Sequence, residues 1–282
     1  MSPTVHALRA GLNRGWIELK LTFTNGQDLW SYLFMPAVFT VVMLFMRDST
    51  VPGTDFSLGA RTLPSVLGAT IAFGGLITLA QLLTVEREDG TLLRAKAIPH
   101  GMLGYLVGRI VLSSGMVLVG FVMTLVPGLI LFDGLAVGLG SWLTLVWVVL
   151  IGLVATLPIG AVLGSLFANP RNMGVVILPI MGLVAISGIF YPISALPTWT
   201  QWLAQGFPIY WTGLGMRSAL LPGDLAAVEI GGSWRHLETL GVLSAWAVLG
   251  LVVAPMLLRR MARRESGSSV AARREKALQR VS

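Results

Sequence analysis

Six apolar stretches constrain the fold of this sequence more than any other feature does. Each stretch is close to the roughly 20 residues that a helix needs to cross the hydrocarbon core of a bilayer. Only 12% of the 282 residues are charged, about half the usual share in a soluble domain, and the mean hydropathy is +0.79. We therefore expect an all-α integral membrane protein, with six transmembrane helices at residues 29–46, 63–85, 103–132, 142–167, 173–191 and 237–258.

An amphipathic helix is predicted before the first span, over residues 4–25. Its apolar residues recur every three or four positions, while charged and amide side chains take the other faces. Such a helix is expected to lie in the membrane interface, with a Trp at headgroup depth. The regular spacing favours this interpretation over an unstructured polar leader. The apolar positions are Leu8, Leu12, Trp16, Leu19 and Phe23.

The Lys and Arg residues predict the orientation. If both termini lie in the cytoplasm, 16 of the 20 basic residues fall on the inner side, and four, Arg47, Arg61, Arg217 and Arg235, fall outside. Cytoplasmic loops carry such an excess, so we expect a multi-pass protein of the plasma membrane with both termini inside. Residues 259–282 form a basic cytoplasmic tail, which we expect to be drawn to anionic membrane lipid.

The densest charged run lies between the second and third predicted spans, at residues 86–99. Each of its charges would cost roughly 2.5–3.5 kcal/mol at the centre of a membrane helix, so the segment is expected to be in water. Leu92, Leu93 and Ile98 give it an apolar side. Two interpretations stay open: a short amphipathic helix that docks a soluble partner, or an ordinary solvated connection.

The second predicted span carries a stripe of small and polar residues, Thr70, Gly74, Thr78 and Gln81, at spacings of four, four and three. Facing lipid, these residues would waste their capacity for close packing and hydrogen bonding, so the stripe should face protein or a cavity. Helix packing and a cavity wall both fit this pattern. A Gly-x-x-x-Gly pattern at residues 160–164 in the fourth span also predicts close helix packing.

Several kinds of active site are missing from the sequence. No ionisable residue lies near the middle of any predicted span, although ion-coupled carriers need such residues there. No Gly is followed by Lys, which excludes a phosphate-binding loop, and metalloprotease and serine-hydrolase motifs are absent. Without Cys there is no disulfide and no thiolate metal site. We therefore expect no catalysis and no cofactor in this chain, and energy supplied by another polypeptide.

The longest predicted outer segment covers residues 192–238 and is not simply polar. Apolar pieces broken by Pro suit helices that dip into the outer leaflet and return. We therefore expect a re-entrant helical hairpin between the fifth and sixth spans. Four aromatic residues of this segment, Trp199, Trp202, Tyr210 and Trp211, fit a belt at the outer membrane interface.

Two local motifs resemble the membrane subunits of type 2 ATP-binding-cassette (ABC) exporters, the permease family that includes the daunorubicin-resistance exporters. Residues 86–92, Glu-Arg-Glu-Asp-Gly-Thr-Leu, look like the family's Glu-Arg-Glu-x-Gly-Thr-Leu at the cytoplasmic coupling helix. Residues 187–197, followed by Pro-Ile-Tyr at 208–210 and by Arg217, look like the end of the fifth span and the re-entrant hairpin. One departure is Phe207, where the family usually has Asn.

The resemblance implies that residues 1–258 form the transmembrane domain of a bacterial exporter permease. It would pair with a second permease, as a homodimer or a related heterodimer, and with two cytoplasmic ATPase subunits that bind ATP and Mg; no nucleic acid is expected. An apolar pathway without fixed charge favours hydrophobic or amphiphilic cargo, such as drugs, antibiotics or lipid-like molecules. The alternative is a non-transporting assembly or regulatory subunit.

The resemblance also assigns two sets of site residues. The first set couples the permease to its ATPase and comprises Glu86, Arg87, Glu88, Asp89, Gly90 and Thr91. The second set comes from the second and fifth spans, which are expected to line the substrate pathway, and comprises Thr70, Gly74, Thr78, Gln81, Ser187 and Phe190.

Overall fold

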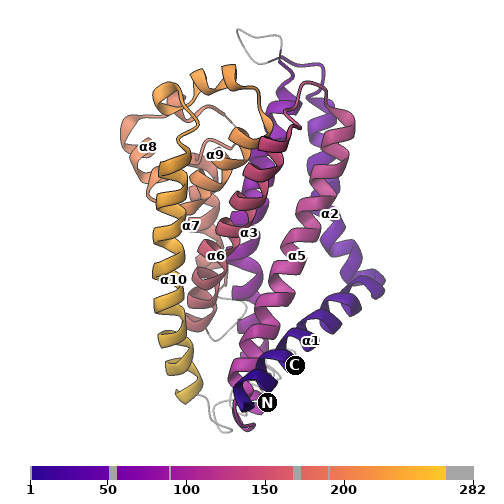
Figure 1. The fold of residues 1–282 in the computed structure, drawn as a ribbon, viewed down its shortest axis with the longest axis vertical. Coiled ribbons are helices and arrows are strands. Elements are labelled where there is room, and N and C mark those ends of the chain that lie inside the picture. Colours follow the sequence, from indigo (N-terminus) through magenta and orange to yellow (C-terminus); the bar gives the residue numbers. More distant parts are fainter. Residues whose placement is uncertain (1, 51–55, 89, 168–172, 190, 265–282) are drawn as a thin grey trace, which may run out of the picture.

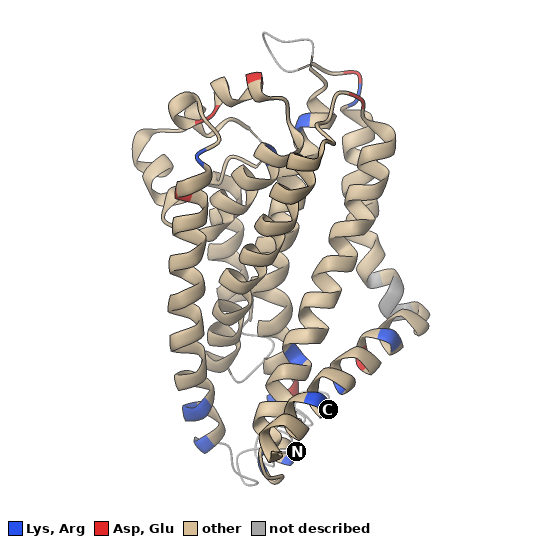
Figure 2. Ribbon diagram, viewed as in Figure 1, with Lys and Arg blue, Asp and Glu red and all other residues tan. Residues whose placement is uncertain are grey.

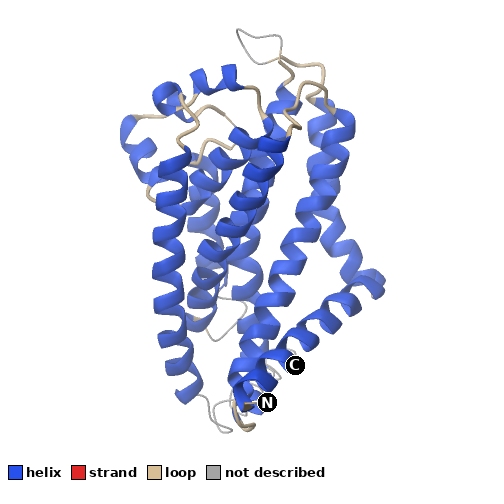
Figure 3. Ribbon diagram, viewed as in Figure 1, coloured by secondary structure: helices blue, strands red, loops and turns tan. Residues whose placement is uncertain are grey.

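Helices form most of the described part of the chain in a computed structural model, which covers residues 2–50, 56–88, 90–167, 173–189 and 191–264 (Figures 1 and 3). The predicted all-α class is therefore correct. Within the described residues, four helices are long and apolar enough to cross a membrane. They are α3 (Leu58–Glu88), α5 (Gly101–Leu131), α6 (Leu139–Leu166) and α10 (His236–Arg264).

The other two predicted spans are shorter apolar helices. The first is α2 (Gly26–Phe45), and the fifth is α7 (Met173–Ile186). The prediction continued the fifth span to residue 191, but the helix ends at Ile186. Two residues later Gly188 has a φ of +72°, a left-handed conformation that glycine adopts at little cost and that ends a helix. The prediction of six full-length spans is therefore met by four of the described helices, while α2 and α7 are shorter than predicted.

The helix α3 lies at the centre of the bundle and packs against α5, α6, α7 and α9 (Pro208–Leu220). Its contact with α6 is close enough to exclude side chains. A Cβ built on Gly160 would lie 2.6 Å from the carbonyl oxygen of Leu76, and one on Gly164 would lie 2.8 Å from that of Ala80. Such distances leave room only for hydrogen, so the packing predicted for residues 160–164 is confirmed.

The first helix, α1 (Pro3–Thr24), runs beside the first half of α5, and α2 follows after a turn at Asn25 (Figure 1). Its bounds agree with the predicted amphipathic helix at residues 4–25. Leu12 and Trp16 are about half exposed on its outer side. Its position in the membrane interface stays a prediction.

A pair of short helices, α8 (Thr198–Gln205) and α9, stands where the re-entrant hairpin is predicted, between α7 and α10 (Figure 1). The two helices differ sharply in burial. Trp199 and Trp202 on α8 are 68% and 72% exposed, whereas Tyr210 and Trp211 on α9 are buried. The entry of this pair into the outer leaflet stays a prediction. Short 3-10 turns flank the pair: Ile193–Ala195, Gly223–Val228 and Ile230–Gly232.

Basic residues gather at one end of the bundle (Figure 2). That end contains the N-terminal half of α1, the end of α3, the short helix α4 (Thr91–Lys96), the start of α5 and the end of α10. We call it the basic end. The pair α8 and α9 lies at the opposite end, which we call the hairpin end.

Candidate functional site

The charged segment at residues 86–99 is divided between two helices. Its first part completes α3, which ends at Glu88, and its second part forms α4. Between them Gly90 has a φ of +81° and precedes the first residue of α4. A residue with a side chain would be strained there, so the glycine allows the chain to turn sharply from α3 into α4. Asp89 lies outside the described residues.

Glu86 points into the protein rather than into water, contrary to the expectation that the whole charged run is solvated. Its side chain is only 11% exposed. One carboxylate oxygen pairs with Nη1 of Arg109 at 3.0 Å, and the other accepts a hydrogen bond from the Tyr105 hydroxyl at 2.6 Å. Both partners come from α5, so Glu86 ties the end of α3 to the start of α5.

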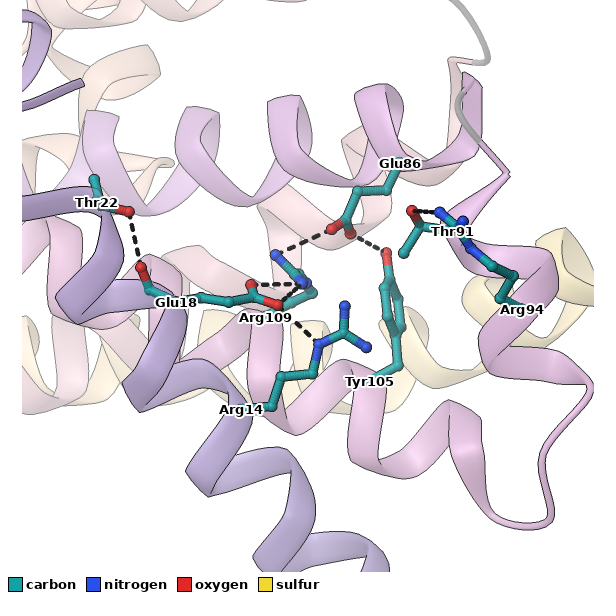
Figure 4. A network of polar contacts seen from close by, with 8 residues as sticks. All are labelled: Arg14, Glu18, Thr22, Glu86, Thr91, Arg94, Tyr105 and Arg109. Carbon is teal, nitrogen blue, oxygen red and sulfur yellow. Dashed lines mark hydrogen bonds and ion pairs between the residues drawn. The ribbon is translucent and has the colours of Figure 1, made fainter. Parts of the chain in front are cut away.

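Arg109 extends this connection to α1. Its side chain is 5% exposed, and its Nη2 lies 2.6 Å from Oε2 of Glu18. Glu18 in turn accepts a hydrogen bond from Nε of Arg14, one turn earlier on α1, at 2.8 Å. Figure 4 shows how Glu18 and Glu86 approach the Arg109 guanidinium from two different helices. We call Glu18, Glu86, Tyr105 and Arg109 the carboxylate–arginine network.

Charge neutralisation explains why the network can be buried. An isolated charge removed from water is very costly, but a well-paired and hydrogen-bonded one is tolerated. Breaking such a pair on one side typically costs about 3–5 kcal/mol, because the remaining charge stays buried without its partner. The network is therefore a rigid joint between α1, α3 and α5.

Glycines bring α1 and α5 close enough for this joint to form. A Cβ on Gly15 would lie 2.5 Å from the carbonyl oxygen of Gly108, and one on Gly11 would collide with that of Gly104. The two helices run in the same direction and touch backbone to backbone. Sequence reasoning missed this contact, although Gly11-x-x-x-Gly15 and Gly104-x-x-x-Gly108 both have the small-x-x-x-small spacing that permits it.

The remaining residues of the predicted coupling set have separate positions. Arg87 donates hydrogen bonds to the carbonyl oxygens of Ser165 at 3.1 Å and Phe167 at 3.4 Å, and so covers the end of α6. Thr91 accepts a hydrogen bond from Arg94 at 2.9 Å. Glu88 is the last residue of α3.

The outward surface of α4 and its following turn is basic and apolar. Leu92 and Ala95 of α4 are buried against the bundle, whereas Arg94, Lys96 and Ile98 are exposed. Charge and docking surface, which the sequence motif at residues 86–92 combined in one segment, therefore lie in different places in the structure. Glu86 lies in an internal joint, and the surface that a partner can touch lies further along the segment.

The predicted pathway residues of α3 lie on its least buried face. Thr70, Gly74 and Thr78 are partly buried and Gln81 is exposed, whereas the opposite side of α3 is packed against α6. A Cβ on Gly74 would lie 2.9 Å from the Val117 side chain on α5. The stripe therefore borders α5, and helix packing accounts for Gly74.

Of the two fifth-span residues assigned to the predicted pathway, the structure describes only Ser187. Ser187 is buried just beyond α7, and its hydroxyl donates a hydrogen bond to the carbonyl oxygen of Val184 at 2.7 Å. Phe190 lies outside the described residues. The role of either residue in a pathway stays a prediction.

A second buried arginine lies at the hairpin end; the sequence motif contained this residue but did not predict its burial or its partner. Arg217 of α9 is 2% exposed. Its Nε and Nη2 donate to the two carboxylate oxygens of Glu229 at 2.8 and 3.2 Å, and its Nη1 donates to the Ser65 hydroxyl at 3.2 Å and to the carbonyl oxygen of Gly188 at 3.4 Å. Arg217 thus joins α9 to the start of α3, to the residues after α7 and to the turn before α10.

Comparison with known families agrees with this architecture. A family model described as ABC-2 family transporter protein matches residues 48–254, which include α3 to α9 and most of α10. No curated protein matches the chain. The family match confirms the resemblance inferred from residues 86–92 and 187–217, and the chain belongs to the ABC-2 family of transporter proteins.

Proposed function

We propose that this chain is the permease subunit of an ATP-driven exporter in which a separate subunit hydrolyses ATP. Membrane subunits of the ABC-2 family are transport components and not catalysts. The observation that carries the proposal is the carboxylate–arginine network, because it links the segment resembling a coupling helix, through Glu86 at the end of α3, to both α1 and α5.

The proposed coupling has two parts. The ATPase subunit presses on the outward surface of α4 and its following turn, where Arg94, Lys96 and Ile98 are exposed. Displacement of α4 moves the end of α3 through the turn at Gly90, and the network then carries α1 and α5 with it. A joint of buried ion pairs transmits movement well because its members are costly to separate.

The cargo pathway is proposed to run along the least buried face of α3, between this chain and a second permease. Thr70, Thr78 and Gln81 offer hydroxyl and amide groups on a surface that is otherwise apolar. Such a surface suits hydrophobic or amphiphilic molecules with a few polar groups, because it carries no fixed charge that would have to be desolvated.

Two variants separate docking from transmission. Reversing the exposed charges of α4 with R94E and K96E should abolish co-purification of the ATPase, because only the outer surface of α4 changes. Replacing Glu86 with Gln keeps the shape and the hydrogen bond to Tyr105 but removes the charge that faces Arg109. We expect E86Q to retain the ATPase and to lose roughly tenfold in cargo-stimulated ATP turnover, the equivalent of ~1.4 kcal/mol.

The measurements are co-purification of the ATPase and compound-stimulated ATP hydrolysis in proteoliposomes. R9E is the control, since Arg9 is exposed on α1. Full retention of binding by the double variant, together with normal stimulation in E86Q, would show that the segment is a solvated connection and would contradict the proposal.

A further inference from the structure

A small cavity lies at the hairpin end, between the start of α3, the residues that follow α7, and α9. Its volume is about 10 Å³, which is the room that a single water molecule needs. Arg61, Thr62 and Ser65 line it from α3, because positions three and four apart share one face of a helix. Arg217 borders it from α9. The remaining lining residues are Leu58, Gly188, Ile189 and Tyr191.

One positive charge of this cavity has no counter-charge. Arg217 is matched by Glu229, to which it donates two hydrogen bonds. Arg61 is partly buried beside this pair, and within the described part of the chain it has no hydrogen bond and no ion pair. Among the described residues, no Asp or Glu lines the cavity. An unpaired charge that is removed from water is costly, so an anion in the cavity would stabilise the fold.

Ser65 adds a buried donor that has no acceptor. It is 2% exposed, and its hydroxyl oxygen accepts a hydrogen bond from Nη1 of Arg217 at 3.2 Å. On the same helix, Thr62 and Thr70 donate their hydroxyl protons to carbonyl oxygens four residues earlier, but no such bond is found for Ser65 among the described residues. Buried polar groups nearly always have a partner. The free hydroxyl proton and the unmatched charge of Arg61 both require a ligand that accepts hydrogen bonds and is negative.

We propose that this cavity binds one small monovalent anion, either a halide such as chloride or the end of a carboxylate group. The anion accepts charge-assisted hydrogen bonds from the Arg61 guanidinium and the Ser65 hydroxyl. The volume admits neither phosphate nor sulfate. A water molecule would satisfy Ser65 but would leave the charge of Arg61 unmatched. The bound anion strengthens the junction of α3 with α9, and its binding needs neither cargo nor ATPase.

Thermal unfolding of the purified full-length chain in detergent can measure this binding. Sodium chloride or sodium acetate would replace sodium gluconate at constant ionic strength, so that screening stays the same. Gluconate is too large for the cavity. We expect chloride or acetate to raise the Tm until the effect saturates, because a ligand that binds only the folded state stabilises it. A larger effect of chloride would identify a halide site, and a larger effect of acetate would identify a carboxylate site.

Two variants test the two donors separately. R61Q removes the charge and should lower the apparent affinity for the anion by roughly tenfold or more, as expected when a hydrogen bond to a charged group is lost. S65A keeps every charge and should also weaken the response, so it tests the site independently of R61Q. The matched control is R47Q, because Arg47 is exposed near the start of α3 and does not line the cavity.

Three results would overturn the proposal. The first is a Tm of the unmodified protein that does not depend on which anion is present. The second is an equal loss of response in R47Q and R61Q, which would show attraction to the overall charge of this end. The third concerns Asp55, which lies outside the described residues. An anion response that appears only in D55N would identify Asp55 as the counter-charge of Arg61.

Discussion

At the residue scale, two buried arginines organise opposite ends of the protein. Arg109 is paired with Glu18 and Glu86 near the basic end, and Arg217 is paired with Glu229 near the hairpin end. In each case the carboxylates come from other elements of the fold. A charge buried in this way specifies which elements must meet, because any other arrangement leaves it unpaired.

The pair at the hairpin end gives a prediction about stability. Both side chains are nearly inaccessible, at 2% and 4% exposure, so R217M should cost about 3–5 kcal/mol by leaving Glu229 buried and unpaired. E229M should cost a similar amount. The double variant R217M/E229M should cost much less than the sum of the two.

Thermal unfolding of the purified protein in detergent would provide this double-mutant cycle. E238Q is the control, because Glu238 forms an exposed pair with Arg235 at the same end; its Tm should barely change. Additive losses in the double variant would mean that the two side chains do not stabilise the fold as a pair.

The sequence could have revealed the pairing of Arg109 but not that of Arg217. Arg109 lies inside the span predicted at residues 103–132, and a charge within a span requires a partner. Glu86 and Glu18 are carboxylates predicted near the same end of the protein, so their pairing with Arg109 could have been predicted. Arg217 and Glu229 are twelve positions apart on different elements, and no helical or strand spacing predicts such a contact.

At the scale of elements, glycine decides which helices touch. Close helix packing at residues 160–164 was predicted because this Gly-x-x-x-Gly pattern lies in an evident span, and the structure shows that the partner is α3. The contact of α1 with α5 also depends on glycines spaced four residues apart. We did not predict it, because an amphipathic helix was expected to lie on the surface. Burial of Gly11 and Gly15 shows that α1 also packs on the bundle.

Substitution of Gly11 tests this contact. G11A should destabilise the protein, because the new Cβ would collide with the carbonyl oxygen of Gly104 and push α1 away from Arg109. G241A is the matched control, since a Cβ added to Gly241 of α10 would have no atom within 4 Å. The control should be neutral or stabilising by up to about 1 kcal/mol, as expected when Ala replaces Gly in a helix.

The comparison requires Tm values and the fraction of monodisperse protein after purification. Equal Tm shifts in G11A and G241A would contradict close packing of α1 on α5. A selective loss in G11A would also lower cargo-stimulated ATP turnover, because Glu18 would no longer reach Arg109.

At the scale of the whole molecule, α3 connects the two charged centres. Ser65 near its start contacts Arg217, and Glu86 near its end contacts Arg109. The same helix carries the stripe of small and polar residues between them. The helical class and the approximate positions of the long helices were predictable, because apolar length is a property of each stretch of sequence. The positions of side chains between helices were not, since the sequence does not state which faces meet.

Orientation can be tested directly because the chain contains no Cys. A single cysteine at Ser2 should be protected from membrane-impermeant thiol reagents in intact cells, whereas one at Thr198 of α8 should be labelled. Permeabilised cells provide the control, in which both positions should react. Labelling of the Ser2 position in intact cells would reverse the orientation and place the basic end, with α4, outside.

The Gly–Gly contact between α1 and α5 also has a consequence for biosynthesis. The ribosome completes α1, α2, α3 and α4 before the partner face of α5 exists. Until then Glu18 has no Arg109, and the glycine face of α1 has nothing to cover it. A chain that stalls before α5 therefore displays a carboxylate that lacks its partner on α5 and a bare backbone surface near the membrane. Those features mark an unfinished protein for chaperones and proteases, and the arrival of Gly104 and Arg109 removes both at once.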